Sequence, residues 1–266
     1  MRLMLLGTQG WIPTPRRETT CLAVYDDEVL FIFDAGTGLS RFLQPPAADL
    51  LGGGREVHLL LTHYHLDHVC GLAYLPGIMQ GKPVVVHVPD AALNSVDPER
   101  GVPDLIRKPF NPGGFREHAD FHLQVLHEGD NEVAGHVVRL RSQCHPDTTV
   151  AYRLDDRLVL ATDTVADAQT ADFARDAQVL LHEAWLDGVE ESDPAQREFV
   201  ETSYRAHSSA RQVAGIASEA GVGRLVLMHL NPLRDEAYYE QMERAARETF
   251  AETHVYPDLQ ELELDD

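Results

Sequence analysis

Apolar runs long enough to cross a bilayer are missing from the sequence of 266 residues. No window approaches the roughly 18 apolar residues that a membrane-spanning helix requires. The apolar stretch within residues 1–7 is too short for the core of a secretory signal, and no small-residue cleavage site follows it. We therefore expect a cytoplasmic protein with no membrane partner, and a β-strand at this end of the chain.

Cysteine is also scarce. The three residues, Cys21, Cys70 and Cys144, are far apart and form no CxxC pair. An odd number of scattered thiols argues against a disulfide framework and is typical of a reducing compartment. Cys70 and Cys144 lie near candidate metal ligands in the sequence. A buried thiol that packs as a small apolar residue is the commoner situation, so we count neither as a ligand.

Basic residues are few: 22 Lys and Arg stand against 43 Asp and Glu, which gives a formal net charge of −21. A negative field repels polyanions, so the composition argues against an extended nucleic acid as partner. Two bound zinc ions would add about four positive charges, enough to attract one phosphate group. Otherwise we expect the acidic residues to form a solvated surface and a charged tail at residues 261–266.

The pattern of apolar residues predicts many short strands followed by a mixture of strands and helices. Residues 90–114 are rich in Pro, Asp, Asn and Gly and are expected to be irregular. One helix should begin at Ser208 or Ser209 and be ended by Gly221 and Gly223, and a second should cover residues 235–250. The expected strands cover residues 3–6, 20–25, 29–33, 57–61, 84–87, 123–126, 136–141, 150–154, 158–161, 179–181 and 225–228. No repeat or linker divides the chain, so we expect a single domain over residues 1–266.

The densest group of ligand-type side chains is the segment His63-Tyr64-His65-Leu66-Asp67-His68, directly after an expected buried strand. His63 and His65 are two residues apart and can point at one ion, and Asp67 and His68 can reach a second ion. Neutral imidazole and carboxylate groups are the ligands that catalytic zinc sites use. The alternative is a polar, histidine-rich surface loop. Four ligand-type residues within six positions favour the metal site.

Further candidate ligands follow other apolar strands. Asp163 follows residues 158–161, His229 follows residues 225–228, and His182-Glu183 follows residues 179–181. His145 lies in a loop before Pro146. Singly these residues are weak candidates, because an isolated histidine is more often a core or surface residue. Strand ends can converge on one site, however, and together these residues could complete the ligand set.

The segment His63–His68 resembles the HxHxDH motif of the metallo-β-lactamase superfamily. Other segments resemble its ribonuclease Z-like branch in the same order along the chain. They are Leu5-Leu6-Gly7-Thr8, Pro13-Thr14-Pro15, Asp34-Ala35-Gly36-Thr37-Gly38, His182-Glu183-Ala184, residues 206–212 and residues 225–232. This similarity extends over nearly the whole chain, and the ordered set is more specific than any single segment.

The resemblance implies an α+β fold, a four-layer αββα sandwich, with two zinc ions. It assigns His63, His65 and His145 to the first ion, and Asp67, His68 and His229 to the second. Asp163 would bridge the two. Manganese or iron would also accept these ligands.

The implied reaction is hydrolysis by a hydroxide that bridges the two ions, since a metal lowers the pKa of bound water towards about 7. Asp67 would orient this hydroxide or accept its proton. The resemblance makes His207 the acid that protonates the leaving oxygen and Glu183 its hydrogen-bonding partner. The alternatives are a helix-capping region for His207 and a surface carboxylate for Glu183. Asp34 is interpreted as a residue that supports a ligand or shapes the turn.

The first substrate hypothesis is a small phosphodiester, cyclic ones included. Only 17 residues separate His145 from Asp163, where tRNA-processing ribonuclease Z carries an inserted arm that grips tRNA, so a tRNA 3′-end endonuclease is disfavoured. Arg107-Lys108 is a rare basic spot that could meet an anion, although a solvated loop is the commoner case. A homodimer is implied by the resemblance alone.

The second substrate hypothesis is a carboxylic ester, lactone or thioester, because one metal centre serves both chemistries when the pocket walls change. Trp185 stands where the family usually has threonine, so the pocket could be reshaped. A non-catalytic zinc protein is disfavoured, since a structural zinc site needs four closed ligands and no acid. The natural substrate, the metal and the oligomeric state are left open.

Overall fold

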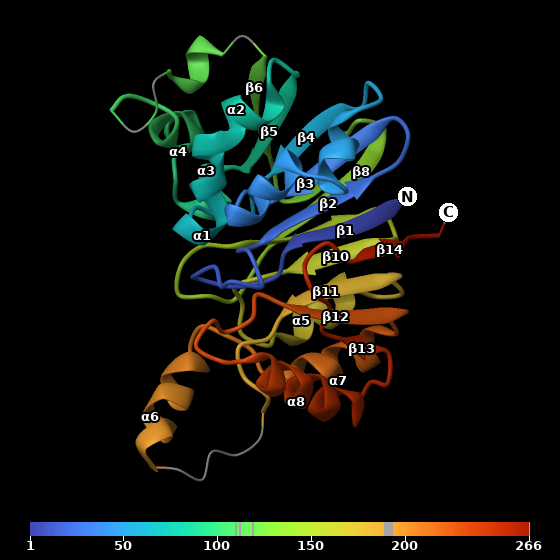
Figure 1. Cartoon of the computed structure of the whole chain (residues 1–266). Helices are drawn as coiled ribbons and strands as arrows, with labels where there is room; N and C mark the ends of the chain where they lie inside the picture. The colour runs from blue at the N-terminus through green and yellow to red at the C-terminus, as the bar shows by residue number, and fades with distance from the viewer. Residues whose placement is uncertain (110, 112, 119, 189–193, 266) are drawn as a thin grey trace. The chain divides into compact units, whose positions relative to one another are not determined.

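The computed structural model describes residues 1–109, 111, 113–118, 120–188 and 194–265. The chain divides into two compact units, one made of Met1–Glu128 with Pro257–Asp266 and the other of Gly129–Tyr256. Each unit contains one mixed seven-stranded sheet and several helices (Figure 1). Within the described part of the chain, every helix is too short or too polar to cross a membrane. The expectation of a single domain stays a prediction.

The first unit begins with three strands and ends with a strand from the carboxyl terminus. Its strands are β1 (Arg2–Gly7), β2 (Cys21–Tyr25), β3 (Val29–Phe33), β4 (Glu56–Leu60), β5 (Val84–Pro89), β6 (Phe121–Leu126) and β14 (Glu261–Glu263). Its helices are η1 (Thr37–Leu43), η2 (Ala47–Leu51), α1 (Leu66–Val69), η3 (Cys70–Tyr74), α2 (Leu75–Met79), α3 (Ala91–Asn94), α4 (Pro98–Leu105) and η4 (Phe115–Glu117).

Among its described residues, the second unit has the same number of strands as the first and fewer helices. Its strands are β7 (Gly129–Val133), β8 (His136–Ser142), β9 (Val150–Leu154), β10 (Leu158–Ala161), β11 (Val179–Glu183), β12 (Arg224–Met228) and β13 (Thr253–His254). Its helices are α5 (Ala168–Phe173), α6 (Pro194–Ser203), α7 (Ala210–Ala220) and α8 (Glu236–Arg247). Helices α7 and α8 lie side by side (Figure 1).

The two sheets share one topology. In the first, the order is β14-β1-β2-β3-β4-β5-β6, antiparallel from β14 to β3 and parallel from β3 to β6. In the second, the order is β13-β12-β11-β10-β9-β8-β7, antiparallel from β7 to β10 and parallel from β10 to β13. Because parallel strands end at the same edge of a sheet, each sheet gathers the residues that follow its parallel strands.

The composition of the central strands explains their burial. Val29–Phe33 and Leu158–Ala161 are buried at every position, as expected for parallel strands that are covered on both faces. In the first unit, one face of the sheet packs with η1, η3, α2 and α4 into a single apolar core. In the second unit, α5, α7 and α8 pack against side chains of β10 to β12.

The helix expected after Ser208 or Ser209 is confirmed as α7. Ser209 is its N-cap in a capping box with Gln212, and Gly221 ends it with a φ of +66°. Its inner face is formed by small and branched residues such as Val213 and Ala217. The helix expected over residues 235–250 is α8, capped by Asp235. Local cap residues therefore set both ends of α7 and the start of α8, whereas α8 ends at Arg247, three residues before the expected end.

Two expectations about polar segments were wrong. Residues 90–114 are not irregular throughout, because Asp90 caps α3 and Asp97 caps α4, with Pro98 at the first position of α4. The tail at residues 261–266 is not simply solvated: its first three residues form β14, which pairs with β1, and Leu262 and Leu264 are buried. The acidic residues hid the alternation of buried and exposed side chains that defines this strand.

Two buried histidines in the first unit give the fold an expected pH dependence. Nδ1 of His58 and Nε2 of His87 are 3.0 Å apart, so these rings share a hydrogen bond on adjacent strands. Burial, and to a smaller extent the neighbouring His58, lower the pKa of His87 to about 3. The pKa of His58 is also lowered, chiefly by burial.

Acidification should therefore destabilise the protein through His87. The unfolded chain binds a proton at this residue below its ordinary pKa of about 6.5, whereas the folded chain does not until pH 3, so stability falls as the pH falls through this window. The expected loss from His87 alone is about 2 kcal/mol between pH 7 and pH 5. Urea unfolding at several pH values measures it. His87→Gln, which keeps a hydrogen-bonding group, should flatten the slope, and an unchanged slope would contradict the assignment.

Candidate functional site

Three polar residues that lie at or just beyond the ends of parallel strands share an uncommon backbone conformation. Asp34 follows β3 with a φ of +59°, Asp163 lies two residues beyond β10 with a φ of +51°, and His229 follows β12 with a φ of +49°. Aspartate and histidine tolerate this left-handed region better than most residues. The abrupt turn after each strand places the side chain at the carboxyl edge of its sheet.

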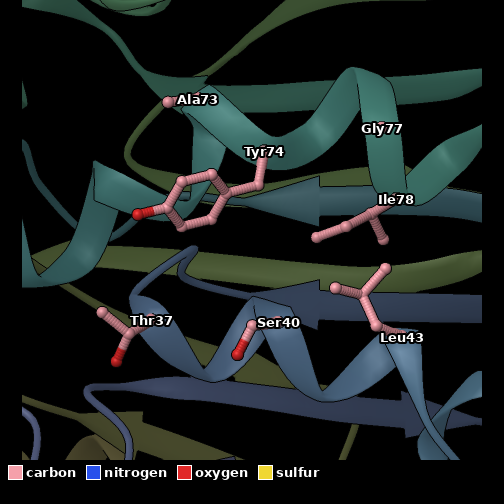
Figure 2. Close-up of a pocket in the computed structure, with 7 residues that line it drawn as sticks. All are labelled: Thr37, Ser40, Leu43, Ala73, Tyr74, Gly77 and Ile78. Atoms are coloured by element: carbon pink, nitrogen blue, oxygen red, sulfur yellow. The ribbon is translucent and has the colours of Figure 1, made fainter.

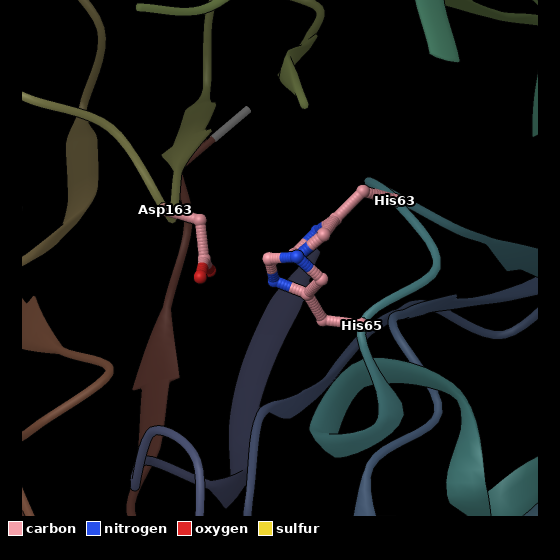
Figure 3. A group of neighbouring side chains, drawn as sticks. All are labelled: His63, His65 and Asp163. Atoms are coloured by element: carbon pink, nitrogen blue, oxygen red, sulfur yellow. The ribbon is translucent and has the colours of Figure 1, made fainter. Parts of the chain in front are cut away.

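In the first unit, the segment after β4 gathers four candidate ligands. The ring of His63 lies 4.4 Å from that of His65 and 4.3 Å from that of His68, measured between centroids. The side chains of His63 and His65 extend from one loop, with their rings close together (Figure 3). His63 and His68 are buried, and Asp67 is half-buried. Neutral imidazoles crowded beside a carboxylate are the donor set of a metal site.

Asp34 holds one of these imidazoles in place. Its Oδ2 lies 2.8 Å from Nδ1 of His68, and its Oδ1 accepts a hydrogen bond from the Thr62 backbone N–H at 2.7 Å. With Nδ1 bound in this way, Nε2 is the nitrogen that can ligate a metal. Asp34 thus supports a ligand, in agreement with its expected role.

The remaining nitrogen of His68 has a spacing that fits a shared ion. Its Nε2 lies 3.4 Å from Oδ2 of Asp67, longer than an ordinary hydrogen bond. Two ligands that are each about 2.0–2.1 Å from a tetrahedral zinc ion lie about 3.3–3.4 Å apart. These two side chains therefore fit a metal ion.

The absence of a side chain at Gly36 lets the turn after β3 approach the backbone of the ligand segment His63–His68 closely. A Cβ at Gly36 would lie 2.3 Å from the backbone oxygen of Asp67, a distance that no side chain tolerates. Next to it, the Ala35 N–H donates to the backbone oxygen of His68 at 2.7 Å. The Asp34–Gly36 turn therefore fixes the backbone of Asp67 and His68 as well as the imidazole of His68.

Removal of the Asp34 carboxylate should weaken metal binding. Asp34→Asn is expected to lower the affinity for zinc about 10- to 100-fold, because residues that orient a ligand typically contribute this much. Competition with a chromophoric chelator measures the affinity. Asp26→Asn is the matched control, since Asp26 accepts backbone hydrogen bonds in a turn away from the ligands. Equal affinities of the two variants would contradict the role of Asp34.

In the second unit, Asp163 and His229 form a similar pair. His229 Nε2 lies 3.3 Å from Asp163 Oδ2, the same spacing as between His68 and Asp67. Both side chains are buried. Thr162 donates a hydrogen bond to Asp163 Oδ2 at 2.8 Å, and Thr149 donates to the backbone oxygen of Asp163 at 3.0 Å. This pair also fits a metal ion.

Beside this pair lies the expected acid and its partner. Nδ1 of His207 is 2.9 Å from Oε2 of Glu183, which is fully buried at the end of β11. The other carboxylate oxygen of Glu183 accepts the Thr164 backbone N–H. Glu183, His207 and His229 offer ligand-type atoms within 4.8 Å of one another. The alternative of a surface carboxylate for Glu183 is thereby excluded.

Trp185 lies flat against the ring of His207. The centroids of the two rings are 4.4 Å apart with an interplanar angle of 13°, and the Trp185 ring is 5.7 Å from that of His229. His145 is half-buried, with its ring 6.1 Å from that of His207. Burial lowers the pKa of His145, which favours the neutral form that binds metal, although the charge of Asp163 opposes this shift. The second unit thus brings the expected residues Asp163, Glu183, His207 and His229 together, with His145 at its border.

Two contacts with these residues were not expected from the sequence. Trp11 donates its backbone N–H to Oδ2 of Asp67 at 2.7 Å, across 56 positions of the chain. Thr164 bonds to Glu183 through its backbone N–H, and its carbonyl accepts from Ser208 at 2.7 Å. Backbone groups carry no sequence signal of their own, so only the position of Thr164 beside Asp163 could have drawn attention to it.

A separate pocket of about 620 Å³ lies in the first unit between η1 and the η3–α2 segment (Figure 2). It is lined by Thr37, Ser40, Leu43, Ala73, Tyr74, Gly77 and Ile78. None of these seven residues is a candidate ligand, so this pocket is not part of the clusters described above.

Comparisons with known proteins give matches over most of the chain. Residues 14–205 match the Metallo-beta-lactamase superfamily. The chain is 30% identical to a ribonuclease Z of Mycobacterium avium over 284 residues, which cover 100% of this chain and 99% of that protein.

Two solved structures are similar over almost the whole chain. The metallo-beta-lactamase fold protein YhfI from Bacillus subtilis has a TM-score of 0.74 at 18% identity, covering 98% of this chain and 99% of its own. A diphosphatase from the PhnP family has a TM-score of 0.69 at 18% identity, covering 99% and 98%. The predicted fold class is confirmed.

Proposed function

Because this chain belongs to the metallo-β-lactamase superfamily, in which it is a metal-dependent hydrolase with His/Asp metal-binding clusters, we propose that it hydrolyses a small phosphodiester, cyclic ones included. The observation that carries this proposal is the buried Glu183 bonded to His207 beside Asp163 and His229. The relative named ribonuclease Z and the diphosphatase of similar fold both bear names of enzymes that act on phosphorus–oxygen bonds.

The proposed cofactor is a pair of zinc ions. His63, His65 and His145 would hold one, Asp67, His68 and His229 the other, and Asp163 both. Imidazole and carboxylate donors also suit manganese or iron. Bound in this way, the metals supply a nucleophile by lowering the pKa of water, and they neutralise charge on the phosphate oxygens. The donor types and the 3.3–3.4 Å spacings of two ligand pairs support the proposal.

The protein's own residues would move the protons. Asp67, whose Oδ2 is oriented by the Trp11 N–H, accepts the proton of the attacking water. His207 protonates the leaving oxygen through Nε2, because its Nδ1 is bound to Glu183. The charge of Glu183 stabilises the protonated imidazole, and Trp185 fixes the plane of the ring. An alkoxide is a poor leaving group, so a placed acid matters most for phosphodiesters of ordinary alcohols.

A small molecule is the proposed substrate in place of an extended nucleic acid. The net charge of −21 opposes a long polyanion, and the short connection between His145 and Asp163 offers no arm to hold one. A single phosphate needs only the local positive charge of the metals. The homodimer implied by the family resemblance stays a prediction.

A carboxylic ester, lactone or thioester is the second candidate, and the position of Trp185 favours it. The indole lies against His207, where it adds an apolar wall beside the acid. Such a wall suits the apolar part of an acyl group.

One experiment separates these candidates. Bound metal is measured by elemental analysis, and a phosphodiester, a carboxylic ester, a lactone and a thioester are then assayed side by side. We expect about two metal ions per chain and turnover of the phosphodiester above the other three. Turnover of the carbonyl substrates alone would replace the first proposal by the second.

A further inference from the structure

The loop between β1 and β2 carries an exposed tryptophan directly over a metal-ligand residue. The Trp11 N–H donates to Asp67 Oδ2 at 2.7 Å. Trp11 has a φ of +58°, and the Ile12 N–H donates to the Gly10 oxygen at 2.7 Å, so Trp11 is the centre of a three-residue turn. This conformation is strained for a residue other than glycine, and such strain tends to be kept where it serves a site.

The loop is held firmly at both ends by one carboxylate. Asp258 is almost fully buried, and its Oδ1 accepts from the Thr8 hydroxyl at 2.9 Å. Its Oδ2 accepts from the Glu18 N–H at 2.7 Å and from Arg41 at 3.1 Å. Because Gln9 also donates to the Glu18 oxygen at 2.9 Å, the loop closes on itself. The position of Trp11 is therefore preorganised.

Large apolar side chains are exposed around this point. The exposed fractions are 57% for Trp11, 44% for Ile12 and 69% for Leu66. Leu66 precedes Asp67 in the chain, and the Trp11 backbone is bonded to Asp67. Large apolar side chains that are exposed together on linked segments mark a ligand or partner site more often than a single exposed residue does.

We propose that Trp11, with Ile12 and Leu66, forms an apolar subsite for a planar aromatic group, a nucleobase, carried by the phosphodiester. This inference rests on the proposed function. A phosphate bound at the metal ion that Asp67 would hold would place the rest of the substrate beside the indole. The large flat face of tryptophan stacks on any base without hydrogen-bond readout, and base–aromatic stacking is a general mode of recognition. The substrate class is thus a small, base-bearing phosphodiester such as a nucleoside cyclic phosphate.

The test compares two cyclic phosphodiesters that differ only in the base. Adenosine 2′,3′-cyclic phosphate and methyl riboside 2,3-cyclic phosphate are assayed with wild type, Trp11→Ala, Trp11→Phe and Tyr74→Ala. We expect Trp11→Ala to lower the ratio of kcat/KM for the adenosine compound over the base-free compound about 10- to 100-fold. Trp11→Phe should retain most of the ratio. Tyr74, 50% exposed and part of the lining of the separate pocket, is the matched aromatic control and should leave the ratio unchanged.

Binding gives a readout that does not depend on turnover. The chain has two tryptophans, and we expect adenosine 5′-monophosphate to quench the fluorescence of Trp11, with this quenching absent in Trp11→Phe. If wild type hydrolyses neither cyclic phosphate, the proposed function fails. The fluorescence measurement then tests the subsite by itself, and an absence of quenching in wild type would overturn it. An equal loss on both substrates in Trp11→Ala would overturn the subsite. Loss of metal in Trp11→Ala would also overturn the subsite. A change of oligomeric state in this variant, measured by light scattering, would overturn it as well and would assign Trp11 to an interface with a second copy of the chain.

Discussion

Replacement of His68 by alanine is expected to remove bound metal and to lower kcat/KM by roughly 1,000-fold or more. The imidazole is fully buried, and its hydrogen bond to Asp34 fixes the direction of Nε2. Alanine offers no donor atom at this position. Loss of a metal removes both the activated nucleophile and the charge that stabilises the phosphate, which together contribute several kcal/mol. Elemental analysis of the purified variant and initial rates measure the two effects.

Asp163→Ala should show the same double loss, although it changes the other unit of the chain. Its carboxylate pairs with His229 at 3.3 Å, as Asp67 does with His68 at 3.4 Å. His127→Ala is the matched control, because His127 is exposed and its ring lies 2.8 Å from Asp90, which is not a proposed ligand. If His68→Ala or Asp163→Ala kept both the metal and the wild-type rate, the proposed ligand set would be wrong.

Replacement of His207 by alanine is expected to leave the metal in place and to lower kcat by roughly 100- to 10,000-fold, the usual contribution of a general acid. The residue is bonded to Glu183 and stacked on Trp185. The loss should be large for an alkyl leaving group and small for p-nitrophenolate, which departs without a proton. A comparison of the two phosphodiesters therefore identifies the proton donor, with metal content as the check that the site is intact.

Glu183→Gln tests the same pair from its other side. The amide keeps a hydrogen bond to His207 but removes the charge that favours its protonated form, so a smaller loss of kcat is expected than in His207→Ala. Equal rates of His207→Ala and wild type on the alkyl phosphodiester would remove the acid role. A loss of metal in His207→Ala would show that His207 acts as a ligand.

Most of the strands were predictable because each is a local apolar run. Val29–Phe33 and Leu158–Ala161 are both expected and observed as buried strands. The strands that the sequence did not predict, β7, β13 and β14, are rich in acidic and polar residues. Strand β14 exists because it pairs with β1, more than 250 positions earlier. Such a pairing depends on the whole fold, so a short window of sequence gives no signal for it.

The chemistry of the site was set by the sequence alone. The segment from His63 to His68 places four donors within six positions, and this local density needs no tertiary structure to be recognised. The pairing of Glu183 with His207 was expected only from the family resemblance, because residues 24 positions apart carry no joint local signal. The tertiary structure alone revealed the Trp11 N–H on Asp67 and the indole of Trp185 against His207. The sequence shows which donor groups are present in a short segment. The partner of a backbone amide or of an aromatic ring depends on how distant segments pack, so only the tertiary structure shows it.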